Sequence, residues 1–596
     1  MKRLYKLEII ALILSALIGL NAMFISANGL YDNLFLNYFN EIRVVLINIL
    51  IIYGVILILS LLTNQLWLSF FIVSIFVNLF SFVNFNKIIY RSEPLYFSDF
   101  ELINEAGTMA KKYNLNLLSI NAIMLYIGIL ITFLVSFYLF NHRKSFYVCH
   151  KFKKIIFSML VYGLFINFFI FDYDLYHKLG KATGLDVWNS VEGYESKGFV
   201  YSFTYSIKST MPYKYKNYNK KQAQDVLNNY SYIPLDEDKK ISIMGFMLES
   251  FKDFHKYESE KLIFEKNPYE YFEELRANSL HGSILVNSFG GGTFLTETNF
   301  LTGYKNNPTY NKPVDTYLRY FKNEGYKTLA FHPNTGSFYN RNNAYEKIGF
   351  DEFYEYDNTY SKIDKNLLMN DRFFPEVIRV FDENIKTSPV FSFGVTYESH
   401  GPYDSEKPMY DTAYIKWQDS YNKADYTYFN NYLYTIDRVS QSIKILTEYL
   451  NSLDKPVILI LFGDHSPSMG EGMSIFKMFG INVNPQKAEG IVNIYETPYV
   501  VWGNNKAKEV LGYDFNKEGE ILEPALLMPY IMKELNLGGS EYLNAMKDLI
   551  NNMTVIKEHF FRFNGNYVGD PNEDEKKLIH EYRNLEYYNS HKKIKN

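Results

Sequence analysis

The chain has 596 residues, with 61 Lys and Arg against 65 Asp and Glu, a formal net charge of −4 and a single cysteine. This length exceeds what one hydrophobic core supports, so we expect at least two domains. The charges are dispersed and form no basic stripe, so we expect no nucleic acid among the partners. The one cysteine, Cys149, lies in the first third of the chain, so the remainder must fold without disulfides.

The apolar runs that are long enough to span a bilayer, about 18 to 20 residues, all lie before Asp172. They cover residues 7–27, 44–63, 66–85, 117–140 and 155–171. The first run is too long for a secretory signal and is followed by further spans, so we interpret it as an anchor. The sequence therefore predicts a five-span transmembrane domain over residues 1–172.

The positive residues predict the orientation of these spans. They precede the first span and lie between the fourth and the fifth, at Lys2, Arg3, Lys6, Arg143, Lys144, Lys151, Lys153 and Lys154. Because cytoplasmic loops are enriched in Lys and Arg, both places are assigned to the cytoplasm. We therefore expect a multi-pass protein of the cell membrane whose C-terminal part is extracellular.

Residues 173–240 are rich in Tyr, Lys and Asn. Within them Phe199, Val200, Phe203 and Ile207 recur near helical spacing. Such a pattern is typical of a helix that lies in the plane of the membrane interface. We therefore predict an interfacial helical linker here.

Residues 241–555 alternate short β-rich runs with longer mixed segments. The runs are residues 241–248, 283–289, 328–331, 390–396, 457–462 and 499–502. This alternation predicts an extracellular α/β domain with a mainly parallel sheet between helices. The last residues, 556–596, are expected to form a polar tail with one helical piece around residues 578–588.

An Asp-His pair follows one of the predicted strands. The run 457–462 stops at Gly463, and Asp464 and His465 come next. The carboxyl end of a buried strand is a rigid base for metal ligands, and an ordinary turn is the alternative. Glu249 follows the run 241–248 in the same way, where its other role would be to cap a helix.

Thr293 follows three glycines, residues 290–292, and precedes a predicted helix. Glycines let the backbone approach an anion, and a helix N-terminus favours negative charge; the alternative is that Thr293 only caps the helix. Glu249, Thr293, Asp464 and His465 together offer three oxygen ligands and one imidazole, a set compatible with Mn²⁺, Mg²⁺ or Zn²⁺. A coordinated cation would lower the pKa of the threonine hydroxyl and bind an oxygen of the phosphate or sulfate under attack.

Two further histidines, His332 and His400, follow β-like runs as His465 does. Three histidines at one sheet edge indicate a site, and His400 is expected to act as the acid for a leaving alkoxide. Tyr339 and Arg341 come downstream of His332. Arg341 would form a fork on a phosphate and Tyr339 would pack against a small polyol, with an ordinary surface arginine as the alternative.

In their order these motifs resemble the lipoteichoic acid synthase group of the alkaline phosphatase/sulfatase superfamily. The matching motifs are Glu249 after its strand, Gly-Gly-Gly-Thr293, His332, Asn340-Arg341, Ser399-His400, Gly463-Asp464-His465, Thr497-Pro498-Tyr499 and Glu581-Tyr582-Arg583. The five-span anchor fits as well. In two places the chain departs from the group: the segment before Thr293 is glycine-rich where the synthases carry Gln and Lys, and Tyr339 replaces a Trp.

The resemblance implies a role for each candidate residue. The metal ligands, usually of Mn²⁺, would be Glu249, Thr293, Asp464 and His465. Thr293 would also be the nucleophile. The glycerol-phosphate pocket would be lined by His332, Tyr339, Arg341 and His400.

The implied activity is that of a membrane-anchored phosphoglycerol transferase. It would move glycerol phosphate from phosphatidylglycerol, through a phospho-threonine intermediate, to a glycolipid, a teichoic-acid-type polyglycerol-phosphate chain or a cell-wall glycan. A phosphoethanolamine transferase shares the anchor, fold and threonine, but the members of that group usually carry disulfides in the external domain. A sulfatase needs a formylglycine motif, which Cys149 does not provide. A non-catalytic envelope scaffold would be expected to have lost at least one of the four ligands.

Overall fold

The computed structural model describes residues 2–27, 38–91, 94–102, 117–142, 151–179, 190–210, 215–306, 308, 310, 312–336, 338–363, 366–557 and 559–594. The chain forms two compact units, Met1–Met211 and Pro212–Asn596. The boundary falls inside the segment predicted to be a linker. Cys149, Arg143 and Lys144, which enter the predicted orientation, lie outside the described residues.

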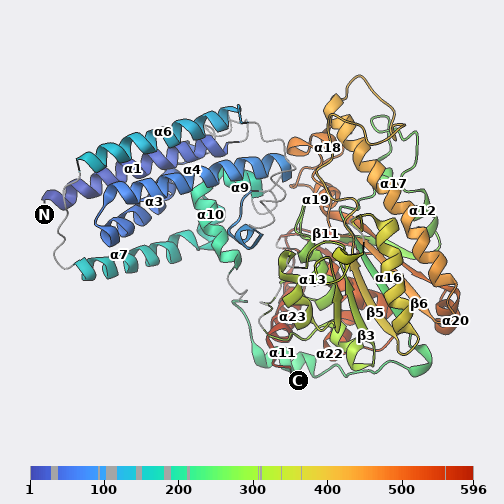
Figure 1. Cartoon of the computed structure of the whole chain (residues 1–596). Coiled ribbons are helices and arrows are strands. Elements are labelled where there is room, and N and C mark those ends of the chain that lie inside the picture. The colour runs from blue at the N-terminus through green and yellow to red at the C-terminus, as the bar shows by residue number, and fades with distance from the viewer. Residues whose placement is uncertain are drawn as a thin grey trace. The chain divides into compact units, whose positions relative to one another are not determined.

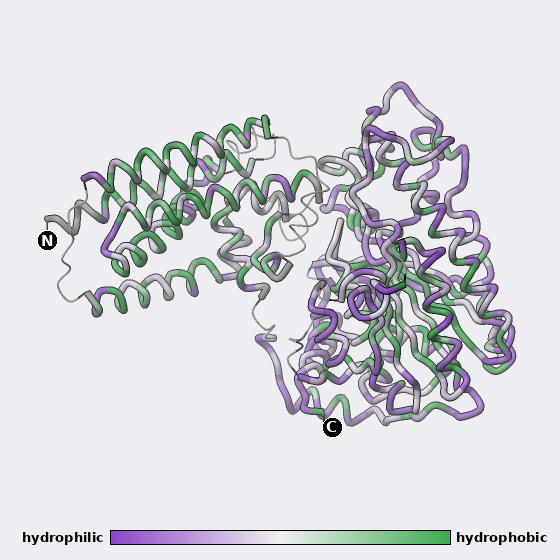
Figure 2. Tube along the Cα trace, viewed as in Figure 1, coloured by the Kyte–Doolittle hydropathy of each residue, from purple (hydrophilic) through white to green (hydrophobic). Residues whose placement is uncertain are grey.

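The N-terminal unit is helical (Figure 1). Its helices are α1 (Lys2–Ser26), α3 (Ile42–Thr63), α4 (Leu66–Arg91), η2 (Phe97–Leu102), α6 (Ile120–Asn141), α7 (Lys151–Phe165), the π-helical η3 (Ile166–Ile170), α8 (Tyr173–Lys178), α9 (Ser190–Lys197), α10 (Phe199–Ser206) and η4 (Ile207–Thr210). Within the described residues, five helices are long and apolar enough to cross a membrane, and Figure 2 shows them as hydrophobic along most of their length. The five predicted spans are confirmed, and they indicate a membrane protein.

Neutral polar side chains join the apolar helices of this unit. Asn121 of α6 donates from Nδ2 to the carbonyl oxygens of Ile25 and Ala27, at 2.9 and 2.6 Å, at the end of α1. The hydroxyls of Ser74 on α4 and Thr132 on α6 lie 2.6 Å apart. Between apolar helices such bonds specify which helices pair and in which register, because hydrophobic packing alone is not directional.

The predicted interfacial helix corresponds to α10, and its apolar residues pack inside the unit. Phe199 and Tyr201 are buried. Asn48 of α3 donates to the carbonyl oxygen of Lys197 at 2.8 Å and accepts from the backbone N–H of Tyr201 at 2.9 Å. Gly198 has φ +84°, and a Cβ there would lie 2.7 Å from Asn48 Nδ2, so this contact requires glycine. A helical period predicts that a helix has an apolar face. It does not show whether lipid or a neighbouring helix covers that face.

The C-terminal unit is built on an eight-stranded sheet of order β4-β3-β5-β1-β6-β7-β2-β8 (Figure 1). The strands are β1 (Ser242–Leu248), β2 (Leu280–Leu285), β3 (Lys327–Phe331), β4 (Glu352–Tyr354), β5 (Val390–Val395), β6 (Val457–Gly463), β7 (Glu496–Gly503) and β8 (Lys517–Leu522). Every neighbouring pair is parallel except the two that involve β7, which is antiparallel to β6 and to β2. The prediction of a mainly parallel sheet is confirmed.

Helices cover both faces of this sheet. One face packs on α12 (Glu270–Arg276), α16 (Asn370–Ile385), α17 (Lys423–Asn451) and α18 (Ser474–Met478); the other packs on α13 (Thr293–Thr302), α14 (Tyr317–Asn323), α21 (Pro524–Glu534) and α22 (Glu541–Leu549). Strand β1 shows the alternation: Met244 and Phe246 enter the first core, and Ile243 and Met247 enter the second. The remaining helices are α11 (Lys220–Leu227), α15 (Arg341–Ile348), α19 (Ala488–Tyr495), α20 (Asn505–Leu511), α23 (Glu573–His591), η5 (Glu237–Lys239), η6 (His255–Tyr257), η7 (Phe338–Asn340), η8 (Tyr360–Lys362) and η9 (Glu471–Met473).

The segment predicted to be a polar tail takes part in the fold. It contains most of an antiparallel sheet of β9 (Met553–Ile556), β10 (Phe561–Phe563) and β11 (Asn566–Val568), followed by α23. Ile579, Tyr582 and Leu585 of α23 recur at helical spacing and are buried. Asn584 donates to the carbonyl oxygen of Asn219 at 3.0 Å, next to the start of α11. The polar residues therefore form only the outer face of a docked helix.

Candidate active site

Two neighbouring strands bring Glu249 and Asp464 together. Strands β1 and β6 run in parallel with Leu248 opposite Gly463, so the residues that follow them meet at one edge of the sheet. The backbone N–H groups of Ser250 and His465 each donate to Asp464 Oδ1 at 2.7 Å. The Ser250 hydroxyl donates to Glu249 Oε1 at 2.8 Å. Both carboxylates are therefore held in fixed orientations.

His465 directs one ring nitrogen at these carboxylates. Its Nδ1 lies 3.1 Å from the carbonyl oxygen of Ser466, which can only accept, so Nδ1 carries the hydrogen. Nε2 then presents its lone pair, 3.2 Å from Asp464 Oδ2 and 3.7 Å from Glu249 Oε1. The ligand atoms of Glu249, Asp464 and His465 all lie within 4.8 Å of one another, and the three side chains are buried.

The electrostatics of this cluster suit a cation. Burial raises the pKa of Asp464 to about 7, and burial together with the charge of Asp464 raises the pKa of Glu249. Asp464 Oδ2 is buried and takes no hydrogen bond from any residue that the structure describes. Carboxylate oxygens with an imidazole nitrogen are ligands of Mn²⁺, Mg²⁺ and Zn²⁺, so these residues fit a divalent metal.

Thr293 reaches the cluster from a strand two places away. Strand β2 is separated from β6 by β7. The chain after β2 crosses the start of β7, where the backbone N–H of Val286 donates to Tyr495 at 2.9 Å, and the N–H of Gly290 then donates to Ser466 at 2.9 Å. The three glycines that follow, residues 290–292, have φ of 65°, 157° and 81°, and a Cβ on the last would lie 2.9 Å from Ser288 Cβ. This turn therefore depends on glycine.

Thr293 is the first residue of α13, and Gly292 occupies the capping position. The alternative that Thr293 only caps the helix is therefore wrong. Its Oγ1 lies 3.4 Å from His465 Nε2, and the side chain is 7% exposed. Thr296, on the same helix, donates from its hydroxyl to the carbonyl oxygen of Asp464 at 2.7 Å. The structure thus brings together the four candidate ligands.

The two other candidate histidines also lie near the edge of the sheet. His332 directly follows β3 and is 3% exposed, with Nδ1 3.0 Å from the carbonyl oxygen of Val395. Burial and the nearby Arg341 charge hold the pKa of His332 well below its ordinary value, so its imidazole is neutral. His400 stacks on Tyr397 with ring centroids 4.7 Å apart, and the charge of its ring lowers the pKa of Glu249 against the effect of burial.

Arg341 is buried, so the alternative that it is an ordinary surface arginine is wrong. Its Nε and Nη2 contact Glu297 Oε2 at 3.1 and 2.9 Å, and the two side chains are 1% and 0% exposed. Glu297 lies on α13, one turn after Thr293. A lone acid inside a predicted helix carries no sequence signal, which is why Glu297 was not predicted. Glu297 therefore occupies the Nε edge of the guanidinium.

Tyr339 packs against the first turn of α13, and its backbone is strained. Tyr339 and Asn340 both have φ of 55°, a conformation that costs energy in residues other than glycine and that clusters at functional sites. The Tyr339 ring stacks on Phe294, the residue after Thr293, with centroids 5.6 Å apart and planes at 10°. Arg341 Cζ lies 5.4 Å from the same ring.

Comparisons with known proteins agree with this fold. Residues 244–535 match the sulfatase family. The chain is 28% identical over 407 residues, 64% of its length, to a "Putative cyclic beta-1,2-glucan modification protein" of Rhizobium meliloti, and it spans 60% of that relative. It is 31% identical over 147 residues, 24% of its length, to lipoteichoic acid synthase 1 of Bacillus subtilis, and spans 22% of that protein.

Among solved structures, the phosphoglycerol transferase GacH of Streptococcus pyogenes in complex with sn-glycerol-1-phosphate gives a TM-score of 0.47 at 16% identity. That match covers 63% of this chain and 94% of the other. The family match spans the strands that carry Glu249, the Thr293 turn and the Asp464-His465 pair. Residues 244–535 therefore form a sulfatase-family domain, in a chain with lipoteichoic acid synthases among its homologues.

Proposed function

We propose that this protein is a metal-dependent phosphoglycerol transferase with Thr293 as its nucleophile. The observation that supports the proposal is the position of the Thr293 hydroxyl. It stands at the N-terminus of α13, 3.4 Å from His465 Nε2 and beside two buried carboxylates. A hydroxyl in this place can be activated by a cation and can attack an anionic phosphoester that the helix N-terminus attracts.

The residues that would hold the metal are Glu249, Thr293, Asp464 and His465, with Mn²⁺ as the expected ion and Mg²⁺ or Zn²⁺ as alternatives. When bound, the ion lowers the pKa of the threonine hydroxyl and neutralises charge on the phosphate. The backbone N–H groups of Ser250 and His465 orient Asp464, and the Ser250 hydroxyl orients Glu249. His465 keeps Nε2 unprotonated because Nδ1 donates to Ser466.

The reaction is a double displacement. Thr293 Oγ1 gives up its proton to solvent and forms a bond to the phosphorus of phosphatidylglycerol, the bond from phosphorus to the diacylglycerol oxygen breaks, and His400 gives that oxygen a proton. A hydroxyl of the acceptor then attacks the phosphorus of the phospho-threonine and passes its proton to His400. The bond from phosphorus to Thr293 Oγ1 breaks, Oγ1 regains a proton from solvent, and glycerol phosphate stays on the acceptor. Water that enters instead would hydrolyse the intermediate, so the burial of Thr293 favours transfer.

The headgroup would be bound by His332, Tyr339, Arg341 and His400. Glu297 acts on Arg341 as a positioning residue, because its bidentate contact fixes the plane of the guanidinium. Tyr339 offers a ring face for the glycerol. The neutral imidazole of His332 provides a hydrogen-bond partner without adding charge.

Two relatives support different acceptors. The long match to the rhizobial protein, whose name refers to a glucan, supports a cell-envelope glycan. The shorter match to a lipoteichoic acid synthase supports a polyglycerol-phosphate chain or a glycolipid. We propose a glycan acceptor, since that match is the longer of the two, at 64% of the chain against 24%. The five apolar helices would hold the enzyme in the cell membrane beside its lipid donor, with the catalytic unit extracellular.

A lipid-release assay tests the proposal. Full-length protein with Mn²⁺ is given fluorescent phosphatidylglycerol or fluorescent phosphatidylethanolamine, and labelled diacylglycerol is measured. We expect release from phosphatidylglycerol and its loss with a chelator. Release from phosphatidylethanolamine alone would establish the phosphoethanolamine alternative, and release from neither lipid would favour a scaffold. Candidate glycans are then added with phosphatidylglycerol that is labelled in its glycerol headgroup, and transfer of that label identifies the acceptor.

A further inference from the structure

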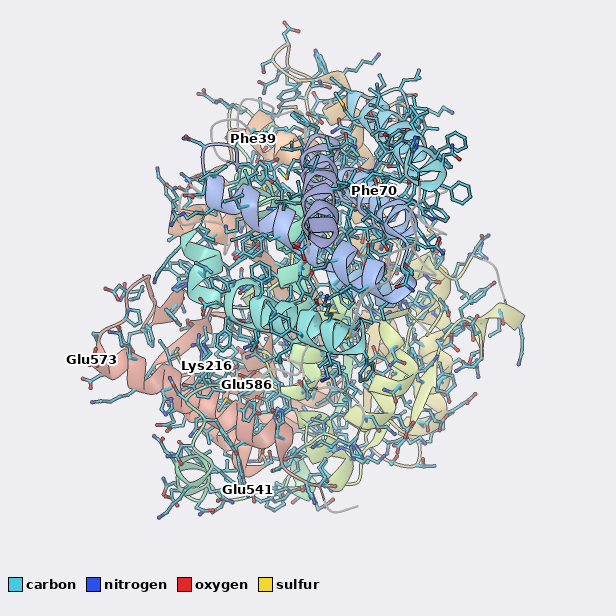
Figure 3. The ribbon with its side chains drawn as sticks, turned by 90° about the vertical axis from the view of Figure 1, so that its left-hand side faces the viewer. Phe39, Phe70, Lys216, Glu541, Glu573 and Glu586 are labelled. Atoms are coloured by element: carbon cyan, nitrogen blue, oxygen red, sulfur yellow. The ribbon has the colours of Figure 1, made fainter. Side chains whose placement is uncertain are left out.

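A cavity of 370 Å³ lies on the C-terminal unit between α23, the small sheet and the residues that precede α11. Figure 3 shows this side of the molecule, with Glu573 at the start of α23 and Lys216, from the segment before α11, beside the helix. Cavities that bind small molecules typically measure about 300 to 1,000 Å³. None of the candidate residues of the active site lines this one.

One face of α23 supplies the polar wall of the cavity. Lys576, His580 and Arg583 lie three or four residues apart, so they project from the same side of the helix. The lining also includes Tyr215 and Phe561. Two permanent cations and two aromatic rings thus line the cavity, and Asp570 is the one carboxylate among the lining residues.

The cationic groups are available to a ligand. Arg583 makes no hydrogen bond or ion pair with any residue in the described part of the chain. Lys576 contacts Glu573 at 2.9 Å, but both side chains are more than half exposed, and exposed pairs of this kind contribute little stability. His580 is instead braced, with Nδ1 2.6 Å from the Tyr215 hydroxyl and Nε2 3.2 Å from Gln222 Oε1. The cavity therefore combines a braced histidine with an arginine that forms no hydrogen bond or ion pair within the described residues.

We propose that this cavity binds the phosphate ester of a small polyol. Arg583 and Lys576 would hold the phosphate, because a guanidinium offers paired N–H donors that match phosphate oxygens. Tyr215 and Phe561 would pack against the carbon chain of the polyol. A lipid headgroup and a soluble glycerol phosphate share this chemistry. The site does not depend on the proposed transferase activity, since binding here involves none of its residues.

Calorimetry on the full-length protein in a neutral detergent tests the site. A Thr293→Ala background prevents turnover, and two probes are titrated, sn-glycerol 3-phosphate and a short-chain phosphatidylglycerol below its micellar concentration. We expect Arg583→Gln to weaken one binding event about tenfold or more, as loss of a charge-assisted hydrogen bond does. Arg583→Lys should weaken it less. Binding of the first probe identifies a soluble source, and binding of the lipid alone identifies a headgroup.

Lys577→Gln is the matched control. Lys577 is the neighbour of Lys576, is 78% exposed and pairs with Asp574, and it does not line the cavity. It should leave both titrations unchanged. The proposal is overturned if Arg583→Gln binds both probes as the parent does, or if the two variants lose affinity equally, which would mean a general effect of surface charge. The melting temperature of each variant, measured without probe, must match that of the parent. If Arg583→Gln melts at a lower temperature than the parent, Arg583→Lys is used in its place.

Discussion

The two units of the chain treat buried polar groups differently. In the N-terminal unit several helices are joined by buried neutral side chains, such as Asn48, Asn121 and Ser74, each with its partner on a neighbouring helix or segment. In the C-terminal unit the buried polar groups include charged ones that converge, as Glu249 and Asp464 do. Neutral groups between apolar helices specify packing, whereas converging buried charges raise the free energy of the apo fold and mark a place where a ligand compensates for them.

The largest effect is expected from Thr293→Ala, which removes the proposed nucleophile and a proposed metal ligand together. Loss of covalent catalysis commonly costs on the order of 10³-fold or more in turnover. We expect diacylglycerol release to fall by that factor with the melting temperature little changed. Thr293→Ser keeps a hydroxyl and should retain measurable activity. Substantial release by Thr293→Ala would show that water attacks directly and that this unit's charges serve another ligand.

Glu297→Gln tests whether the buried carboxylate of Glu297 affects catalysis through Arg341. The substitution keeps the shape but weakens the contact that fixes Arg341, so we expect kcat/KM for phosphatidylglycerol to fall about 10- to 100-fold while Mn²⁺ affinity is kept. Calorimetry with Mn²⁺ beside the release assay measures both quantities. Glu520→Gln is the control, since Glu520 pairs with Arg562 at 2.6 Å and is 46% exposed. If Mn²⁺ affinity falls with Glu297→Gln, the residue supports the metal rather than the headgroup.

The next prediction concerns a buried cation of the C-terminal unit, Lys252. It is 1% exposed and donates to the carbonyl oxygen of Glu496 at 2.9 Å, and burial lowers its pKa to about 7. Between pH 7 and about 10 the unfolded chain therefore binds more protons than the folded one, so this group makes stability rise with pH, by up to about 1.4 kcal/mol per unit. We expect Lys252→Met to flatten the rise of the melting temperature from pH 7 to 9. The exposed Lys506→Met should not, and an unchanged slope in Lys252→Met would contradict the assignment.

The smallest effect is expected in the N-terminal unit. Asn48→Leu leaves the carbonyl oxygen of Lys197 and the N–H of Tyr201 without their partner, and side-chain hydrogen bonds between membrane helices contribute about 0.6 kcal/mol on average. Thermal unfolding in detergent should show a shift of a few degrees at most. Asn86→Leu is the control, because Asn86 donates only within its own helix, to Phe82. Equal shifts in both variants would mean that the contact between α3 and α10 contributes nothing specific.

Periodicity and run length predicted much of the fold. Five spans and six strands follow from hydropathy alone, because burial of a whole element leaves a continuous apolar run. Strand β4 has only three residues and β8 reads Lys-Glu-Gly-Glu-Ile-Leu, so neither leaves such a run. Strand β2 begins at Leu280, three residues before the predicted start. The prediction missed this part because His281 and Gly282 interrupt the apolar run. The direction of β7 could not be predicted, since an alternating pattern carries no polarity.

The candidate site was predictable where side chains follow strands. Asp464, His465 and Glu249 could be placed because parallel strands bring their carboxyl ends to one edge. The contact between Arg341 and Glu297 joins residues 44 positions apart in sequence, and no local pattern encodes it. The structure also shows that Thr293 begins its helix, which composition alone left open.

The turn that carries Thr293 is tied to the Asp464 strand through the main chain. The N–H of Gly290 bonds to the carbonyl oxygen of Ser466, and the Thr296 hydroxyl bonds to that of Asp464. Neither bond involves the side chain of Phe294 or Tyr339. Such a scaffold is evolvable: mutations can exchange the side chains around Thr293 while its hydroxyl stays within reach of Asp464 and His465.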